Sequence, residues 1–258
     1  MRQIFISFAH MAMCLVSPAQ QREKIDSLKK VLQAAKGIQR IDCLNSLGKE
    51  YLFSSPGTQF YDEKRDSSSL FSNQAYREAE DMHYVQGMAE AMFTKGKYAK
   101  DFREKEQAYL KAISFFEQSN NLDTLGQVYF RLGEALRVQA NFQGSLAAYH
   151  RADQLFQQAN DGFHRGVTLT FIGLVYGTSG DFASAFEYGY KALQVREKNK
   201  KQDPTGALWA LCNIGRLFQE VEDYPAAIDY YYTKPRDYAN ANGVSCLHFR
   251  IIKMKLSN

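Results

Sequence analysis

The sequence predicts an all-α protein, a right-handed superhelical solenoid of about five antiparallel helix pairs. Three observations support this fold class: few prolines, an apolar motif with a central glycine that recurs with a period near 40, and Asn or Asp residues at a fixed distance after it. Proline breaks helix interiors, so 5 prolines in 258 residues favour long helices. The hydrophobic share of 45% is that of an ordinary globular chain.

The N-terminal segment Met1–Ala19 has the pattern of a secretory signal peptide. Met1 and Arg2 precede an apolar run over 4–16, and Ser17-Pro18-Ala19 forms a small-x-small end. The run is shorter than the roughly 20 residues that span a membrane. We expect cleavage after Ala19 and an exported, periplasmic protein without a transmembrane segment. The alternative is a buried first helix in a cytoplasmic protein.

Residues 20–40 are predicted as a leading helix, and the repeated motif begins after them. Bulky residues at positions i, i+3 and i+7 lie on one face of a helix. The glycine within the motif costs about 1 kcal/mol in a helix interior, so its recurrence indicates that another helix comes close there. The four copies are Leu44-x-x-Leu47-Gly48-x-x-Tyr51, Tyr129-x-x-Leu132-Gly133-x-x-Leu136, Leu169-x-x-Ile172-Gly173-x-x-Tyr176 and Leu211-x-x-Ile214-Gly215-x-x-Phe218.

A second helix is predicted after each of the last three copies. Asn141, Asp181 and Asp223 follow the glycines by eight residues. Asn and Asp are good N-caps, because their side-chain oxygen accepts a free backbone N–H. A weaker copy, in which Thr94 takes the place of the glycine, completes the series. The predicted repeats are 41–80, 86–118, 123–160, 163–200 and 204–242.

The pattern fails at the far end of the array. Pro235 stands inside the last second helix, where it would kink the helix or cost about 3 kcal/mol, and one inserted residue would restore the register. Residues 243–258 form an atypical basic tail, interpreted either as a truncated sixth repeat or as an improvised cap. A truncated or frameshifted chain is a further possibility.

The recurring motif resembles that of the tetratricopeptide repeat (TPR) family, W-x-x-L-G-x-x-Y followed by A-x-x-x-F in a helix–turn–helix unit of about 34 residues. The resemblance covers about residues 40–240. The period here is nearer 40, and the family's terminal proline is missing. This long-period variety behind a signal peptide is similar to the extracytoplasmic segment of certain bacterial sensor histidine kinases and related regulators.

The resemblance implies a concave groove lined by the first helix of each pair. Carried over by position, the groove residues are Lys49, Phe130, Glu134, Arg137, Leu174, Asn213 and Arg216. Thr170 and Cys212 occupy equivalent positions and are predicted to pack. Arg and Asn would fix a peptide's backbone or carboxylate, while Phe and Leu would take its side chains. The alternative is that these residues are the solvated sides of amphipathic helices. A carboxylate clamp of Lys, Asn and Arg from consecutive repeats is not predicted, because Lys49 and Asn213 lie in distant repeats.

The leading functional hypothesis is a non-catalytic exported scaffold that binds a peptide or protein segment. A sensory input region, truncated before its membrane and output domains, is the alternative, and an enzyme with an unrecognised site is a remote one. No metal, nucleotide or other cofactor motif is present, and the histidines lie singly along the sequence. A net charge of +4 does not indicate nucleic acid. The cysteines form neither a disulfide framework nor a zinc site. The basic run over 196–201 is predicted as a solvated linker.

Overall fold

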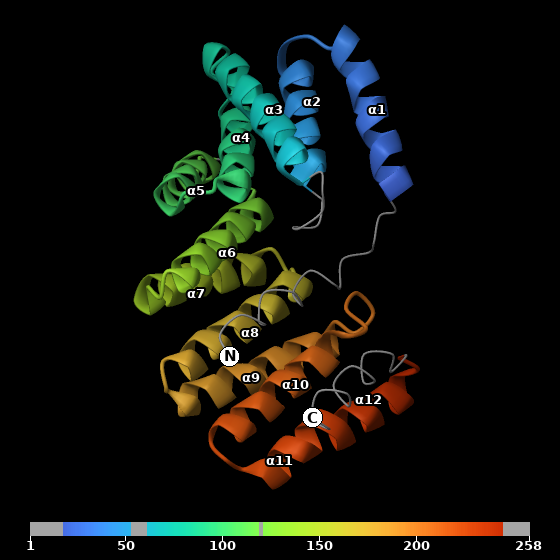
Figure 1. The fold of residues 1–258 in the computed structure, drawn as a ribbon, viewed down its shortest axis with the longest axis vertical. Helices are drawn as coiled ribbons and strands as arrows, with labels where there is room; N and C mark the ends of the chain where they lie inside the picture. The colour runs from blue at the N-terminus through green and yellow to red at the C-terminus, as the bar shows by residue number, and fades with distance from the viewer. Residues whose placement is uncertain (1–17, 53–60, 119–120, 245–258) are drawn as a thin grey trace. The chain divides into compact units, whose positions relative to one another are not determined.

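The computed structural model describes residues 18–52, 61–118 and 121–244, and these residues form helices joined by short turns, without strands. They divide into two compact units, residues 1–121 and residues 122–258. Figure 1 shows the helices of each unit packed as antiparallel neighbours, which confirms the predicted all-α fold of TPR-like helix pairs. Residues 1–17 of the predicted signal peptide and the tail from Ser245 lie outside the described residues, whereas its last two residues, Pro18 and Ala19, begin a helix.

The first unit contains a leading helix and two helix pairs. The leading helix α1 packs against α2, and the two pairs are α2 with α3 and α4 with α5. Ile25 of α1 meets Cys43 and Leu47 of α2, and Ile41 and Leu44 meet Ala75 and Ala79 of α3. The helices are α1 (Pro18–Ala34), α2 (Gly37–Leu52), α3 (Tyr61–Asp81), α4 (Val85–Tyr98) and α5 (Phe102–Phe116).

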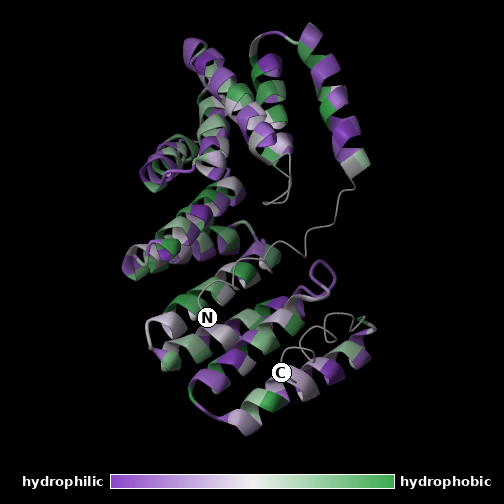
Figure 2. Cartoon of the chain, in the orientation of Figure 1, coloured by the Kyte–Doolittle hydropathy of each residue, from purple (hydrophilic) through white to green (hydrophobic). Residues whose placement is uncertain are grey.

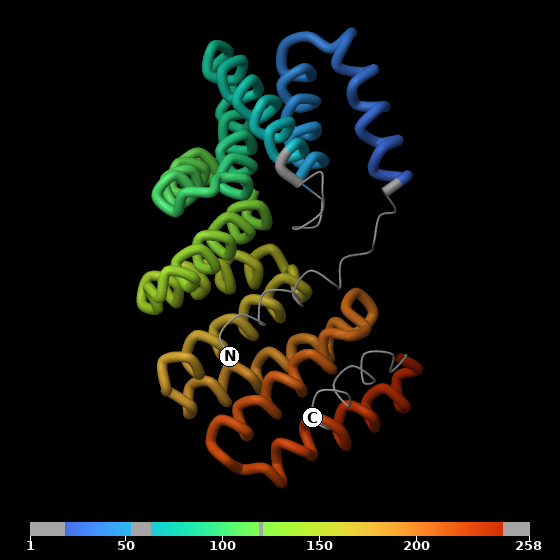
Figure 3. Tube along the Cα trace, viewed as in Figure 1, coloured from blue at the N-terminus to red at the C-terminus, as the bar shows by residue number. Residues whose placement is uncertain are grey.

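The second unit contains three helix pairs. Figure 3 follows its trace through successive reversals from α6 to α12. The first pair is α6 (Leu122–Val138) with α7 (Phe142–Gln158), and the second is α8 (Gly162–Thr178) with α9 (Phe182–Lys198). The third joins α10 (Gly206–Glu220) to a bent second helix made of α11 (Tyr224–Ile228), the π-helical segment η1 (Asp229–Thr233) and α12 (Lys234–Asn242).

The motif glycines lie where the two helices of a pair come closest, as the sequence predicts. A Cβ on Gly173 would lie 3.2 Å from the backbone oxygen of Ala185, and one on Gly48 would lie 2.5 Å from Oγ of Ser72. In the weak copy Gly96 also lies at a close approach, because a Cβ there would overlap the ring of Tyr109. Thr94 is buried, and its methyl carbon lies 3.5 Å from the point that a Cβ on Gly48 would occupy.

The three predicted N-caps are confirmed. The side chains of Asn141, Asp181 and Asp223 each accept the backbone N–H of the residue three positions on, at 3.0–3.1 Å. Asp101 and Asp161 cap α5 and α8 in the same way, although neither was singled out from the sequence.

The Asp181 cap should make the stability of α9 depend on pH. The side-chain and backbone hydrogen bonds from Ser184 to its carboxylate lower the pKa of Asp181. A lowered folded-state pKa means that the stabilisation is present above the unfolded pKa and is lost as pH falls through the folded one. We therefore expect Asp181→Ala to lower the melting temperature at pH 7 and to differ less from wild type at acid pH. Asp181→Asn should keep most of the cap and show a weaker pH dependence.

The π-helical segment explains how the chain accommodates Pro235. Proline lacks an N–H and its ring clashes with the carbonyl four residues earlier, so a regular α-helix cannot continue through it. A π-helical turn holds one more residue than an α-helical turn, and here Lys234 N–H bonds to the oxygen of Asp229, five residues back. The extra residue predicted from the register is therefore present, and it precedes the proline.

Hydropathy differs between the helices in a way that reflects their burial. Figure 2 shows hydrophilic residues along most of α1 and α3 and a larger hydrophobic share along α8. Helix α8 supplies Leu169, Ile172 and Val175 to a buried cluster with Tyr149 of α7 and Ala192 of α9. This cluster is one part of the buried core of the second unit. None of the helices in the described part of the chain is long and apolar enough to cross a membrane.

Candidate functional site

A small hollow in the second unit lies between α8, α9 and α10. It is shallow: its space of about 280 Å³ includes open solvent, and the enclosed part has room for about one water molecule. Ala185, Ala192 and Ala210 are among its smallest residues, together with the two glycines 173 and 189, which leave room because they lack larger side chains. Gly189 stands where the family pattern has an aromatic residue, so the hollow exists in part because that bulk is missing.

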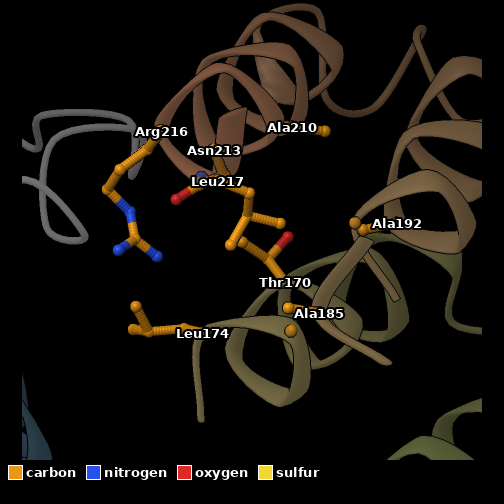
Figure 4. A pocket seen from close by; sticks show the side chains of 10 residues that line it. Thr170, Leu174, Ala185, Ala192, Ala210, Asn213, Arg216 and Leu217 are labelled. Atoms are coloured by element: carbon orange, nitrogen blue, oxygen red, sulfur yellow. The ribbon is translucent and has the colours of Figure 1, made fainter. Parts of the chain in front are cut away.

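Four residues that the sequence places on the concave side line this hollow. They are Thr170 and Leu174 of α8 and Asn213 and Arg216 of α10. Figure 4 shows the Arg216 side chain extending from α10 and that of Leu174 from α8 toward the same side of the hollow. The equivalent spacing of the two motif copies thus brings these residues together from the first helices of two successive pairs.

The hollow offers both polar and apolar groups to a ligand. Arg216 is loosely paired with Glu220, with 3.7 Å between its Nη1 and the carboxylate oxygen, so its guanidinium can engage a second anion. Asn213 donates its Nδ2 to the carbonyl of Trp209 at 2.8 Å, which leaves its side-chain oxygen as an acceptor. Leu174 and Leu217 supply apolar surface. Thr170 Oγ1 donates to Gly166 O within α8, consistent with its predicted packing role.

The predicted groove residues of α6 make contacts within the protein. The ring of Phe130 lies edge-on to Phe171 with centroids 5.2 Å apart and 5.5 Å from Tyr149, so it is partly buried against the core. The Arg137 guanidinium lies 5.7 Å from the centre of the Phe171 ring. Glu134 accepts a hydrogen bond from Arg131 at 2.6 Å. These three side chains are therefore less available to a ligand than their positions on the helix predict.

Lys49 and Cys212 are also engaged inside their own units. Lys49 of α2 pairs with Glu90 of α4 in the first unit. Burial raises the pKa of the Cys212 thiol to about 11, which keeps it a neutral, unreactive packing group as predicted. Cys43 is buried, forms no disulfide and donates its thiol to Leu28 O.

One cluster of titratable side chains was missed by the sequence analysis. Asp123 at the start of α6 meets Asp161 and His164 at the start of α8, with one ligand-type atom of each within 4.8 Å of the others. Asp161 Oδ2 lies 2.5 Å from His164 Nδ1. Burial and the neighbouring Asp161 raise the pKa of Asp123.

This cluster has the donor types that divalent cations use, but its contacts also have a local explanation. Asp161 caps α8 and bonds to His164 three residues on, and Asp123 accepts a hydrogen bond from Gln127 at 2.8 Å. A capping Asp with a nearby His needs no metal. The prediction that the histidines form no metal site is not tested by these contacts, but the approach of Asp123 to Asp161 was missed because it depends on the stacking of successive helix pairs.

The basic run over 196–201 is not wholly a solvated linker, which corrects a further expectation. Its first residue, Arg196, lies in the last turn of α9 and is 7% exposed. Its Nη1 lies 2.7 Å from the carboxylate of Asp203, which is 4% exposed, and its Nε donates to Gly166 O. Arg196 is therefore a structural residue that ties α8, α9 and the start of α10 together.

Residues 124–198 match the family model of the tetratricopeptide repeat. This segment spans nearly all of the two helix pairs α6–α7 and α8–α9, so the similarity to tetratricopeptide repeats covers that part of the chain. The last pair and the first unit share the helix-pair architecture but lie outside the matched residues. No curated protein sequence matches this chain.

Solved structures with the same fold come from proteins of different kinds. The crystal structure of BtubC (BKLC) from P. vanneervenii superposes with a TM-score of 0.66 at 11% identity, over 88% of this chain and 91% of that one. Aspartyl phosphate phosphatase F from Bacillus subtilis superposes at 0.60 with 13% identity, over 85% and 68%. At such identities the likeness shows the fold alone.

A third structure is a signal-transduction ATPase with a TPR sensor, PH0952 from Pyrococcus horikoshii. It superposes with a TM-score of 0.65 at 15% identity, over 92% of this chain but only 39% of its own. The chain thus corresponds to a part of that larger protein. These comparisons do not support the resemblance to sensor histidine kinases. One of the similar structures is a phosphatase, so the prediction that this protein is not an enzyme stays a prediction.

Proposed function

We propose that this protein is a non-catalytic TPR scaffold that binds a peptide or protein segment in the hollow between α8, α9 and α10. The observation that carries the proposal is the convergence of Leu174, Asn213 and Arg216 on that hollow. Solenoid repeats of this kind use continuous surfaces of their helices for binding partners. The matched repeats at 124–198 supply α8 and α9 of this surface.

The groups around the hollow favour a particular peptide chemistry. Arg216 suits a carboxylate, either of an acidic side chain or of a C-terminus, because a guanidinium binds carboxylates with two parallel hydrogen bonds. The free oxygen of the Asn213 amide suits a backbone N–H. Leu174 and Leu217 suit a neighbouring apolar side chain. A peptide with an acidic group beside an apolar residue therefore fits best.

The test begins with peptides selected on the full chain from a random display library. Arg216→Glu should weaken their binding at least about tenfold in fluorescence anisotropy, about 1.4 kcal/mol, because the carboxylate then meets a like charge. Arg151→Glu is the matched control, since Arg151 is exposed on α7 and has no part in the hollow. Equal loss in both variants, or in neither, would contradict the assignment of the hollow.

Export to the periplasm forms a separate part of the proposal. Its support is the signal-like pattern of Met1–Ala19. Fractionation of cells that express the full reading frame, followed by N-terminal sequencing, should find the protein in the envelope or periplasm and starting near Gln20. Recovery from the cytoplasm with Met1 retained would exclude export and leave the binding proposal intact.

A sensory input region is the second candidate function. The match to the protein with a TPR sensor favours it, because that match covers most of this chain and a minor part of the larger protein. Sequencing of the gene beyond the codon for Asn258, in all frames, distinguishes the two. A spanning helix and output motifs there would support the sensory candidate, and an unrelated gene would support the free scaffold.

A further inference from the structure

A second opening in the second unit lies between α7, α8 and α9. Its space of about 680 Å³ includes open solvent, and about 300 Å³ of it is accessible to water-sized groups. That volume lies at the lower end of the range of roughly 300–1,000 Å³ found for small-molecule sites. No described residue lines both this opening and the hollow between α8, α9 and α10. The charged residues that line the opening are Asp153, Arg165, Lys191 and Lys198, and we call it the basic groove.

An ion pair between α7 and α8 contributes to the lining of the basic groove. Nε of Arg165 in α8 donates a hydrogen bond to Oδ1 of Asp153 in α7 at 3.0 Å, and both side chains stay partly exposed. This bond holds the guanidinium in place and uses one of its five N–H donors. The outer nitrogens of the Arg165 guanidinium can therefore bind an anion.

Two lysines of α9 flank Arg165. Lys191 and Lys198 are seven residues apart, about two helical turns, so they lie on one face of α9. Gly166, which follows Arg165 in α8, accepts a hydrogen bond from Nε of Arg196 in α9. Because Arg196 stands between the two lysines, this contact places Arg165 beside the same part of α9. One anion can therefore lie within reach of all three cationic side chains of the groove.

The protein holds neither lysine strongly. Nζ of Lys191 lies 2.5 Å from Oε1 of Glu187, but both side chains of this pair are half-exposed, and exposed ion pairs contribute little to stability. Within the described part of the chain, Lys198 has no hydrogen-bond or ion-pair partner. Both ammonium groups can therefore turn to an anion without giving up a strong interaction.

The charge of the basic groove suits an anion that carries two charges. Three cationic side chains and one carboxylate line it, which gives a net charge of +2. A phosphate monoester carries about −1.5 to −2 charges at pH 7 and offers three acceptor oxygens, whereas a sulfate monoester or a carboxylate carries a single charge. The ring of His150 in α7 lies 5.6 Å from that of Tyr188, which lines the groove. Burial lowers the pKa of His150, so this ring adds no charge at neutral pH.

Apolar side chains beside these charges suit the organic part of such a ligand. Leu169 of α8 and Val195 of α9 line the groove. Leu169 belongs to the buried cluster with Ile172 and Val175, and Val195 packs against that cluster, so this surface is firmly held. A bare phosphate ion would leave the apolar surface and much of the accessible volume to solvent.

We propose that the basic groove binds a phosphate monoester, with the phosphoryl group held by Arg165, Lys191 and Lys198 and the organic group against Leu169 and Val195. The proposal goes beyond the proposed function and does not rest on it, because the groove and the hollow share no lining residue. A ligand in the groove would contact three helices, α7, α8 and α9, at once.

Isothermal titration calorimetry of the full chain with phenyl phosphate tests the proposal. Phenyl phosphate should bind at least about tenfold more tightly than phenyl sulfate, which has a similar shape but one charge, because the doubly charged group makes stronger hydrogen bonds to the three cations. Inorganic phosphate, which lacks the organic group, should also bind at least about tenfold more weakly, because it buries no apolar surface.

Two variants of exposed lysines locate the site. Lys198→Glu should weaken the binding of phenyl phosphate at least about tenfold, because it places a like charge in the groove. Lys201→Glu is the matched control, since Lys201 is exposed three residues further on and does not line the groove. It makes the same change in net charge and should leave the affinity within about twofold of wild type, because solvent and salt screen a charge outside the groove.

Three outcomes would overturn the proposal. The first is the absence of measurable binding of phenyl phosphate to the wild-type chain. The second is an equal loss in Lys198→Glu and Lys201→Glu, or a loss in neither, because binding would then reflect the general charge of the chain or another site. The third is equal affinity for phenyl sulfate or for inorganic phosphate, because the groove would then not select a doubly charged monoester.

Discussion

Asp203→Ala is expected to lower the free energy of unfolding of the second unit by about 3–5 kcal/mol, the usual cost of leaving one partner of a buried ion pair without the other. Arg196 and Asp203 are both almost fully buried, with 2.7 Å between Nη1 and Oδ2. Burial lowers the pKa of Arg196, and the Asp203 carboxylate opposes this shift. Without Asp203 the guanidinium keeps its bond to Gly166 O but loses its buried anionic partner.

Equivalent positions in the preceding helix pairs indicate a second substitution that should restore the lost stability. Fifteen residues after the N-caps Asp101 and Asn141 stand Phe116 and Phe156, and at the same distance after Asp181 stands Arg196. A Cβ on Gly126 would lie 2.8 Å from the Phe156 ring, and one on Gly166 would lie 2.8 Å from Cγ of Arg196. The double variant Arg196→Phe with Asp203→Ala should therefore regain most of the lost stability.

Tryptophan fluorescence during urea unfolding measures both effects. Trp209 is the single tryptophan and lies in α10, so its signal reports on the second unit. Arg196→Phe alone should be as harmful as Asp203→Ala, because it strands a buried carboxylate. Losses below about 1 kcal/mol in the single variants would indicate a solvated pair, for which such small values are typical. If the double variant did not regain stability, a phenylalanine at position 196 could not pack as Phe116 and Phe156 do in the preceding pairs.

This ion pair also shows which part of the fold could not be predicted. Helix pairs and caps follow from signals only a few residues apart, such as Asp181 with Ser184, and these predictions are confirmed. The burial of Arg196 depends on Gly166, thirty residues earlier, and on Asp203, seven residues later. In the sequence Arg196 begins a run rich in lysine, and such runs are normally solvated.

The candidate site likewise combines residues that could be predicted from the sequence with contacts that could not. Position in the motif, carried over from the resemblance to the repeat family, predicted Leu174, Asn213 and Arg216 on the concave side, and all three line the hollow. The same reasoning predicted Phe130 and Arg137 as groove residues, but both side chains contact the ring of Phe171. Helical register fixes the direction of a side chain, whereas its availability depends on how far neighbouring side chains reach. The missed approach of Asp123 to Asp161 has the same origin.

Gly133→Ala is expected to destabilise the second unit although alanine is the better helix former. The added Cβ would lie 2.7 Å from a ring carbon of Tyr149. Tyr149 is fully buried, and its ring lies 5.5 Å from Phe130 and 5.8 Å from Phe171, so it has no room to move. Overpacking of this kind costs about 1–3 kcal/mol, and Gly133→Leu should reach the upper end or beyond.

Gly177→Ala is the matched control within the same unit. Gly177 is also helical, but its Cβ would meet only the methyl Cδ2 of Leu217, at 3.0 Å, and Cβ of Ala185, at 3.7 Å. The Leu217 methyl can rotate away, so the gain in helix propensity of up to about 1 kcal/mol should offset or exceed the contact cost. Urea unfolding followed by Trp209 fluorescence should therefore separate the two variants by roughly 1–3 kcal/mol, the cost of overpacking.

The comparison decides why glycine recurs in the motif. Glycine inside a helix costs about 1 kcal/mol relative to alanine, and the chain accepts this cost at Gly133 and at its equivalents Gly173 and Gly215. If Gly133→Ala were as stable as Gly177→Ala, close packing against Tyr149 could not be the reason. Glycine at the motif position would then need a different explanation, and the register inferred from it, on which the placement of Arg216 also depends, would lose its physical basis.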